Sequence, residues 1–186
     1  MKSILTILLA LLCSQPVSSQ EVDNQNRIYL EFLGKGLFYS VNYEREIIHT
    51  EMNINVNIST GISLFPGLTS LEKSIDLFLP FEVNGSYSFG NHHAVIGYGT
   101  TFWKYKVNHI EIDNTNLSQQ PVEPTLVVIK EWFAHLCFEY RYMKPEGGIM
   151  LKAGYTPLFF AETRNSQLNK SINYQTSFNI GLGWTF

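Results

Sequence analysis

Apolar and polar residues alternate along most of the chain, and the alternation is clearest over residues 172–186. Nearly every second residue there is apolar or aromatic, and the residues between them are polar or glycine. A period of two over such a length predicts a β-strand with one apolar and one polar face. The apolar positions are Ile172, Tyr174, Phe178, Ile180, Leu182, Trp184 and Phe186.

The same alternation recurs in seven upstream segments, and no segment shows a helical period. The connections after the second, fourth and sixth segments are short, and those after the third, fifth and seventh are long, which is typical of transmembrane barrels. The first connection, 34–36, departs from this rule because it is short. The pattern predicts an all-β, eight-stranded antiparallel up-and-down transmembrane β-barrel, with its first seven strands at 27–33, 37–46, 52–64, 75–89, 93–107, 125–143 and 149–160.

Two details of the predicted strands bear on the barrel interior. Asn53, Asn55 and Asn57 share one face of the third strand, and because asparagine is depleted in ordinary strands, that face should be wet or hydrogen-bonded. Pro80 interrupts the fourth strand, since proline cannot donate to the ladder, and it predicts a bulge or a barrel rim at that point.

The N-terminal segment has the composition of a secretory signal. Lys2 precedes an apolar run of about nine residues, too short for a spanning helix, and Val17 and Ser19 suit the −3 and −1 positions of a cleavage site. We therefore expect a cleaved signal peptide over 1–19, a polar lead-in over 20–26 and the barrel over 27–186. Cys13 leaves lipidation open as an alternative, although the preceding Leu12 is larger than a lipoprotein signal prefers.

Composition narrows the class of protein further. Without the signal, Cys137 is the sole cysteine, so no intrachain disulfide can form. The net charge of −3 and the lack of a basic block argue against a nucleic-acid partner. The 13 Phe, 10 Tyr and 3 Trp residues suit the two aromatic girdles of a membrane barrel.

The chain from about residue 27 resembles small eight-stranded outer-membrane β-barrels, the group of OmpA-type and OmpX-type proteins. The run Tyr29-Leu30-Glu31-Phe32-Leu33-Gly34, with the following 37–45, is similar to uncharacterised barrels of Bacteroidetes-type bacteria. The strand 172–186 resembles the closing strand of such barrels, whose terminal aromatic residue is read by the barrel-assembly machinery. We expect no peptidoglycan-binding domain after the barrel, so the OmpA likeness covers the membrane part alone.

The resemblance implies location in the outer membrane of a Gram-negative envelope after signal cleavage. It implies outer-membrane lipids and the barrel-assembly machinery as partners, and an assembly signal formed by Leu182, Trp184 and Phe186. It implies no catalytic residue, and we expect no cofactor. Metal binding is also not expected, because the adjacent His92 and His93 point to opposite faces of a strand and make a poor chelate.

If the apolar faces meet lipid, the polar faces bring charged residues into the interior. An eight-stranded barrel is just wide enough for side chains to fill it, and unpaired charges there are costly, so acids and bases should pair. We expect a polar network that closes the pore; a path for protons or small solutes is the alternative. The expected members are Glu31, Glu44, Asp76, Glu82, His135, Glu139, Arg141 and Lys152.

A lipid-modifying enzyme of the lipid A deacylase type is the alternative to a non-enzymatic barrel. His135, Cys137 and Glu139 share one strand face, but residues two apart lie roughly 6.5 to 7 Å from each other, too far for direct nucleophile activation. The His-x-Ser arrangement of those deacylases is not matched, because Cys137 stands where the serine would be.

The predicted function is therefore that of a non-enzymatic outer-membrane barrel in envelope structure or surface interaction. Its outer loops, expected at 65–74, 108–124 and 161–171, are candidate sites for an extracellular ligand. A secreted soluble barrel of lipocalin type is a further alternative, which would require the apolar faces to point inward.

Overall fold

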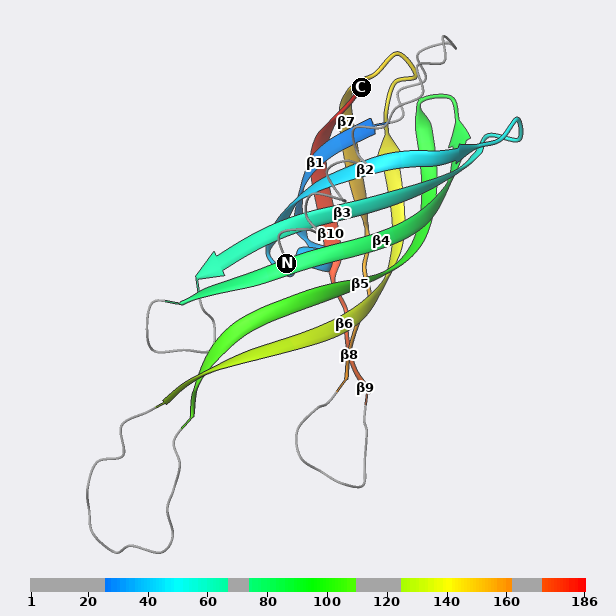
Figure 1. Cartoon of the computed structure of the whole chain (residues 1–186). Helices are drawn as coiled ribbons and strands as arrows, with labels where there is room; N and C mark the ends of the chain where they lie inside the picture. The colour runs from blue at the N-terminus through cyan, green and yellow to red at the C-terminus, as the bar shows by residue number, and fades with distance from the viewer. Residues whose placement is uncertain (1–25, 67–73, 110–124, 162–171) are drawn as a thin grey trace, which may run out of the picture.

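The computed structural model describes residues 26–66, 74–109, 125–161 and 172–186, most of which form strands (Figure 1). The predicted signal peptide, most of the lead-in and most of the three long connections lie outside these residues. The elements are β1 (Asn26–Leu33), the 3-10 turn η1 (Gly34–Gly36), β2 (Tyr39–His49), β3 (Ile54–Pro66), β4 (Ile75–Phe89), β5 (His92–His109), β6 (Thr125–Tyr142), β7 (Gly148–Tyr155), β8 (Leu158–Ala161), β9 (Ile172–Gln175) and β10 (Phe178–Thr185).

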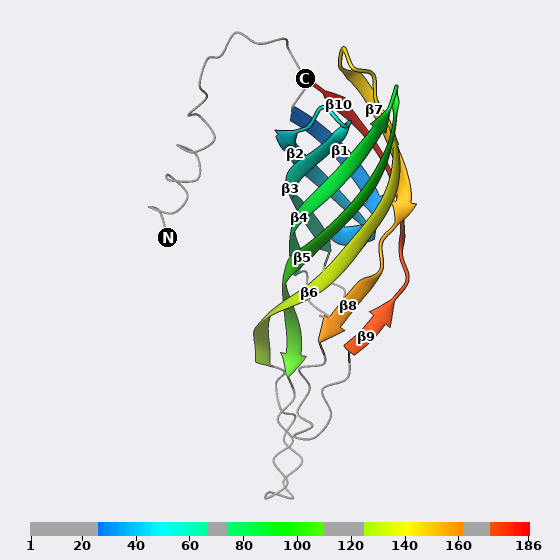
Figure 2. The same ribbon diagram turned by 90° about the vertical axis from the view of Figure 1, so that its right-hand side faces the viewer.

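The strands close into a ring in the order β5-β4-β3-β2-β1-β10-β7-β6, with β6 pairing back to β5 (Figure 2). Every neighbouring pair in the ring is antiparallel. The prediction of a closed eight-stranded antiparallel barrel is confirmed. Within the described residues, no helix is both long enough and apolar enough to cross a bilayer.

The seventh and eighth predicted strands are each broken into two pieces. Residues 156–157 separate β7 from β8, and residues 176–177 separate β9 from β10. The Thr156 N–H donates to the Ser177 carbonyl at 2.7 Å and the Leu136 N–H donates to the Pro157 carbonyl at 3.1 Å. Beyond this break β8 pairs with β6 and β9, so the two pieces continue as an extension of the wall.

The second strand is longer than the alternation predicts, and the turn that follows it is displaced. β2 continues to His49 because an extra residue is accommodated by a register shift between Glu46 and Ile48. The turn then occupies 50–53, where Asn53 has a φ of 60°. The expectation that Asn53 lies on the polar strand face is therefore wrong, whereas Asn55 and Asn57 are buried in the interior.

Pro80 is accommodated without a bulge. The register between β3 and β4 is the same on both sides of Pro80, and the ladder is interrupted only opposite Gly61 and Ile62. The pairing of Pro80 with Thr101 on the other side is kept. The missing N–H of Pro80 thus interrupts pairing with β3 only, and the remaining pairs of β4 keep the register.

The two ends of the barrel differ. The short turns 50–53, 90–91 and 143–147 lie at one end, here termed the turn end, together with the start of β1 and the C-terminus (Figure 1). At the opposite loop end, β5 and β6 extend well past the body of the barrel (Figure 2). This division matches the alternation of short and long connections in the sequence.

Apolar side chains cover the outside of the wall and polar side chains fill much of the inside. Along β4, for instance, Phe81, Val83 and Tyr87 are exposed while Glu82 and Asn84 are buried. This orientation is the reverse of a lipocalin-type barrel, so that alternative is wrong. Near the loop end the interior is apolar, a feature that the alternation did not predict, with a cluster of Phe78, Phe133 and Leu158 packed against Leu37, Phe65, Trp103 and Phe160.

Candidate functional site

All eight residues expected in the interior are buried, with at most 6% of each exposed. They project from five strands: Glu31 from β1, Glu44 from β2, Asp76 and Glu82 from β4, His135, Glu139 and Arg141 from β6, and Lys152 from β7. Their strands lie on opposite sides of the ring, so the closure of the barrel brings together groups that are far apart in sequence.

Five of these residues form a continuous chain of ion pairs across the interior. Lys152 Nζ lies 2.6 Å from Glu31 Oε2 and 2.7 Å from Glu139 Oε1. Glu139 also contacts the Arg141 guanidinium at 2.8 Å, and Arg141 Nη1 lies 2.6 Å from Glu44 Oε1. Charge-assisted hydrogen bonds of this length are the strong ones, and they tie β1, β2, β6 and β7 together.

Arg27 and Glu46 extend this chain toward the turn end. The Arg27 guanidinium lies 2.9 Å from Glu44 and 3.1 Å from Glu46, and it donates to Asn57 Oδ1 at 2.8 Å. Sequence reasoning missed both residues because they stood at the edges of predicted strands. Their spacing could have identified them, because residues an even number of positions apart share one strand face. Arg27 shares a face with Glu31 in this way, and Glu46 shares a face with Glu44.

Lys35 is the third member that sequence reasoning missed. It belongs to η1, which folds into the barrel between Leu33 and Leu37, both with positive φ values (62° and 65°). Lys35 Nζ lies 3.2 Å from Glu82 Oε2 and donates to Tyr29 Oη at 3.0 Å. A connection normally points a lysine toward solvent, so no pattern in the sequence identified it.

Asn84 joins the two halves of the network. Its amide donates to Glu44 Oε2 at 3.1 Å and to Glu82 Oε1 at 3.0 Å. His135 Nε2 lies 3.4 Å from Glu82 Oε2, the carboxylate oxygen to which Asn84 does not donate. Asp76 is buried nearer the loop end and is not one of the residues that these ion pairs join.

The ion pairs connect five carboxylates with four cations. Because buried charges are expensive unless they are paired, each member depends on its neighbours. The interior polar network is defined here as these nine residues together with the linking Asn84. The carboxylates are Glu31, Glu44, Glu46, Glu82 and Glu139, and the cations are Arg27, Lys35, Arg141 and Lys152.

The arrangement around Cys137 does not form a nucleophilic site. Cys137 is a free, fully buried cysteine. The His135 ring faces Glu82 and Thr101, and Glu139 is occupied by Arg141 and Lys152. A nucleophile needs a base within hydrogen-bond reach that a third group orients, and here both flanking groups are engaged elsewhere.

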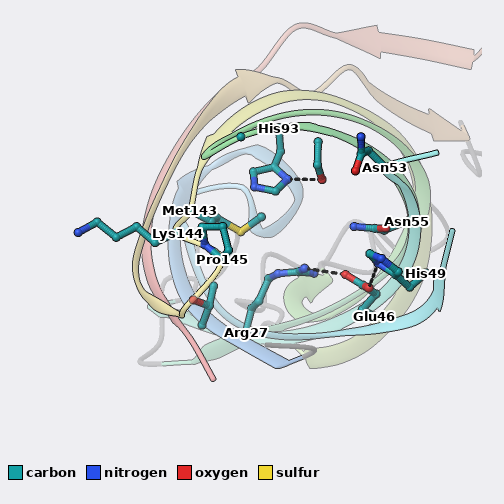
Figure 3. Close-up of a pocket in the computed structure, with 12 residues that line it drawn as sticks. Arg27, Glu46, His49, Asn53, Asn55, His93, Met143, Lys144 and Pro145 are labelled. Carbon is teal, nitrogen blue, oxygen red and sulfur yellow. Dashed lines mark hydrogen bonds and ion pairs between the residues drawn. The ribbon is translucent and has the colours of Figure 1, made fainter. Parts of the chain in front are cut away.

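A cavity of about 270 Å³ opens at the turn end (Figure 3). Arg27, Glu46, His49 and Asn55 line one side of it, and His93 lines the other, with its Nδ1 2.8 Å from Ser88 Oγ. The Arg27–Glu46 ion pair lies at the cavity wall. No cluster of three or more His, Cys, Asp or Glu suited to a metal ion occurs in the described parts of the chain.

The three residues expected to form an assembly signal lie on the outer face near the turn end. Leu182 pairs with Leu30 and Trp184 with Ile28 across the β1–β10 seam. The backbone of Phe186 is hydrogen-bonded to that of Asn26, at 2.9 and 3.0 Å. All three side chains are about half exposed.

Comparison with known proteins supports the fold. No protein-family model and no curated protein matches the sequence. The structure is similar to the crystal structure of the N-terminal β-barrel domain of Pseudomonas aeruginosa OprF, with a TM-score of 0.51 and 9% sequence identity. The similarity covers 87% of this chain and 96% of that domain. At this identity it concerns the fold alone.

Proposed function

We propose that this chain is a non-enzymatic integral outer-membrane barrel that acts in envelope structure or surface interaction. The observation that carries the proposal is the apolar outer wall of a closed ring of strands. A spanning structure must satisfy its backbone groups internally, and a closed barrel does so without helices. Water would be a poor solvent for a wall of this composition.

The exposed apolar residues are too numerous for a soluble surface. Monomeric soluble proteins rarely expose continuous apolar patches beyond a few hundred Å². Here large apolar side chains face outward on strands all around the barrel, among them Ile28, Val41, Ile58, Val83, Ile96, Phe138, Leu151 and Leu182. A lipid environment accounts for all of them at once.

The interior polar network supports a structural role for the barrel lumen. Side chains from opposite walls meet across the interior, as Arg141 and Glu44 do at 2.6 Å. Such contacts occupy the space through which a solute would have to pass. Surface interaction then falls to the connections at the loop end, around 65–74, 108–124 and 161–171, where a solvated ligand or partner would be met.

Solubility and heat-modifiable gel migration test the proposal. We expect the chain without its signal to require detergent and to migrate differently on gels before and after boiling, because a closed barrel resists unfolding by detergent alone. A chain that stays monomeric in plain buffer would refute the membrane role.

The non-enzymatic part of the proposal has its own test. Replacing Cys137 with Ala should leave the lipid A of expressing cells unchanged by mass spectrometry, and deletion of the whole protein should do the same. A change in lipid A acylation on deletion would instead support a lipid-modifying activity.

A further inference from the structure

Charged side chains are rare on the outer wall of the barrel. Between the short turns and the loop-end extension, the strand positions that face outward carry a single charged residue among those described, Arg45 on β2. The pattern changes where β5 and β6 leave the barrel body, because Lys104, Lys106 and Lys130 all face outward there and are exposed.

Lys104 and Lys130 are direct cross-strand partners on the same face of the sheet. Side chains in this relation lie close together, and like charges directly opposite each other destabilise a strand pair. Neither ammonium is joined to a carboxylate within the described part of the chain. Lys106, two residues further along β5, adds a third positive charge to the same face.

The lysine pair lies just beyond the apolar band of the wall. On β5 and β6 the band is bounded by two aromatic pairs, His92 with Tyr142 and Phe102 with Trp132. The ten residue steps between these pairs correspond to roughly 25 Å of barrel height, for about 3.3 Å per residue and a tilt of about 40°. That height matches the apolar band of a membrane barrel, which is about 25 Å tall.

We propose that Lys104 and Lys130 form a binding site for the phosphates of lipid A in the outer leaflet. Resting on the membrane role proposed above, the loop end faces outward, so the lysines stand at the level of the lipid headgroups. A phosphate between the two ammonium groups would convert a repulsive pair into a bridged one. Phe102 and Trp132, directly below, would contact the acyl chains of the same molecule.

Native mass spectrometry of the full chain in mild detergent tests the site, with added lipid A as the probe. The wild-type chain should retain lipid A, and Lys104→Gln with Lys130→Gln should weaken retention roughly 30-fold, at about 1 kcal/mol per lysine. Lys144→Gln, which removes a lysine at the turn end, is the matched control and should bind as the wild type does.

A second variant keeps the result interpretable if the double variant folds poorly. Lys130→Glu creates an opposite-charge pair with Lys104, so it should fold in lipid-free detergent at least as stably as the wild type while losing lipid A. Equal retention by wild type and variants, or binding of phosphatidylglycerol as tight as that of lipid A, would overturn the proposed site. A chain that needs detergent but fails these tests would leave the membrane role standing.

Discussion

Glu44 shows what a single interior residue contributes to this barrel. Its carboxylate is fully buried and accepts hydrogen bonds from Arg27, Arg141 and Asn84, which come from three other strands. Removing its charge leaves two buried guanidinium groups without a shared partner. Each guanidinium keeps one carboxylate, Glu46 for Arg27 and Glu139 for Arg141, so the cost is that of strong hydrogen bonds weakened in the interior.

We therefore expect Glu44→Gln to lower the free energy of unfolding by about 1–3 kcal/mol. Urea unfolding of the refolded chain in detergent, followed by tryptophan fluorescence, measures this change. Glu51→Gln, in the exposed turn 50–53, is the control and should leave the unfolding midpoint where it is. A Glu44→Gln variant as stable as this control would show that the interior network adds little to stability.

Gly99 is a second residue on which the interior depends. A Cβ atom at Gly99 would lie 2.3 Å from the Phe81 carbonyl oxygen and 2.4 Å from His135 Nε2. The carbonyl belongs to the backbone of the neighbouring strand, so it cannot move aside cheaply. We expect Gly99→Ala to destabilise the barrel by about 1–3 kcal/mol, the usual cost of overpacking.

Gly85→Ala is the matched control for that substitution. Gly85 lies on the adjacent strand β4, and the nearest atom to its added Cβ is 4.0 Å away. The same unfolding assay should find this variant within about 0.5 kcal/mol of the wild type. Equal effects of the two substitutions would mean that glycine flexibility, rather than interior space, explains the need for glycine at 99.

At the scale of elements, the two faces of β10 have different roles, although both belong to one alternating pattern in the sequence. Its inward side contributes the buried Asn179, whose amide donates to Thr156 Oγ1 at 2.6 Å. Its outward side carries Leu182 and Trp184 toward the turn end. We propose that recognition by the assembly machinery depends on the outward side, whereas folding in detergent depends on the buried side.

Phe186→Ala should therefore reduce the amount of barrel in the outer membrane while the same variant, refolded in detergent, keeps its heat-modifiable form. Quantitative blotting of outer-membrane fractions measures the first effect and gel migration the second. Phe178→Ala is the control, because Phe178 also faces outward but starts β10, at the end of the strand away from Phe186. Normal membrane levels of the Phe186 variant would refute the assembly-signal proposal.

The element η1 could not have been inferred from strand patterns. The sequence identified 34–36 as a tight turn, and it is one, but only the tertiary structure shows that the turn folds into the barrel. There the Lys35 carbonyl accepts a hydrogen bond from Thr101 Oγ1 at 2.9 Å. The strand breaks at 156–157 and 176–177 were hidden for a similar reason, since the alternation continues through them.

At the scale of the whole molecule, the interior determines whether the barrel conducts. The interior polar network runs from Glu46 near the turn end to Lys35, and the apolar cluster around Phe78 and Phe133 follows toward the loop end. Both layers are built from side chains of facing walls. We therefore expect the reconstituted chain to form no stable channel of nanosiemens conductance in planar bilayers.

Single-channel recording over a range of voltages checks this expectation. The Glu44→Gln variant should show more frequent brief openings than the wild type, because it removes the carboxylate that holds Arg27 and Arg141 together. Stable large openings of the wild-type chain would contradict a filled interior and would favour a path for small solutes.

The alternation of apolar and polar residues by itself determined the number of strands around the ring and the face of each strand that is buried. It could do so because a strand exposes its side chains with a period of two, whatever its partners are. The predicted strand 75–89 coincides with β4 for this reason. The same alternation placed five charged residues on the inward faces of their strands: Glu31, Glu44, Glu139, Arg141 and Lys152.

Only the tertiary structure decided which charges meet, because partners across a barrel depend on register and strand stagger rather than on sequence spacing. It joined Glu44 to Arg141, which are 97 residues apart, and it brought Lys35 inward from a turn. It also placed Lys104 opposite Lys130 on the outer face. These pairings follow from the closure of the ring, which no local pattern encodes.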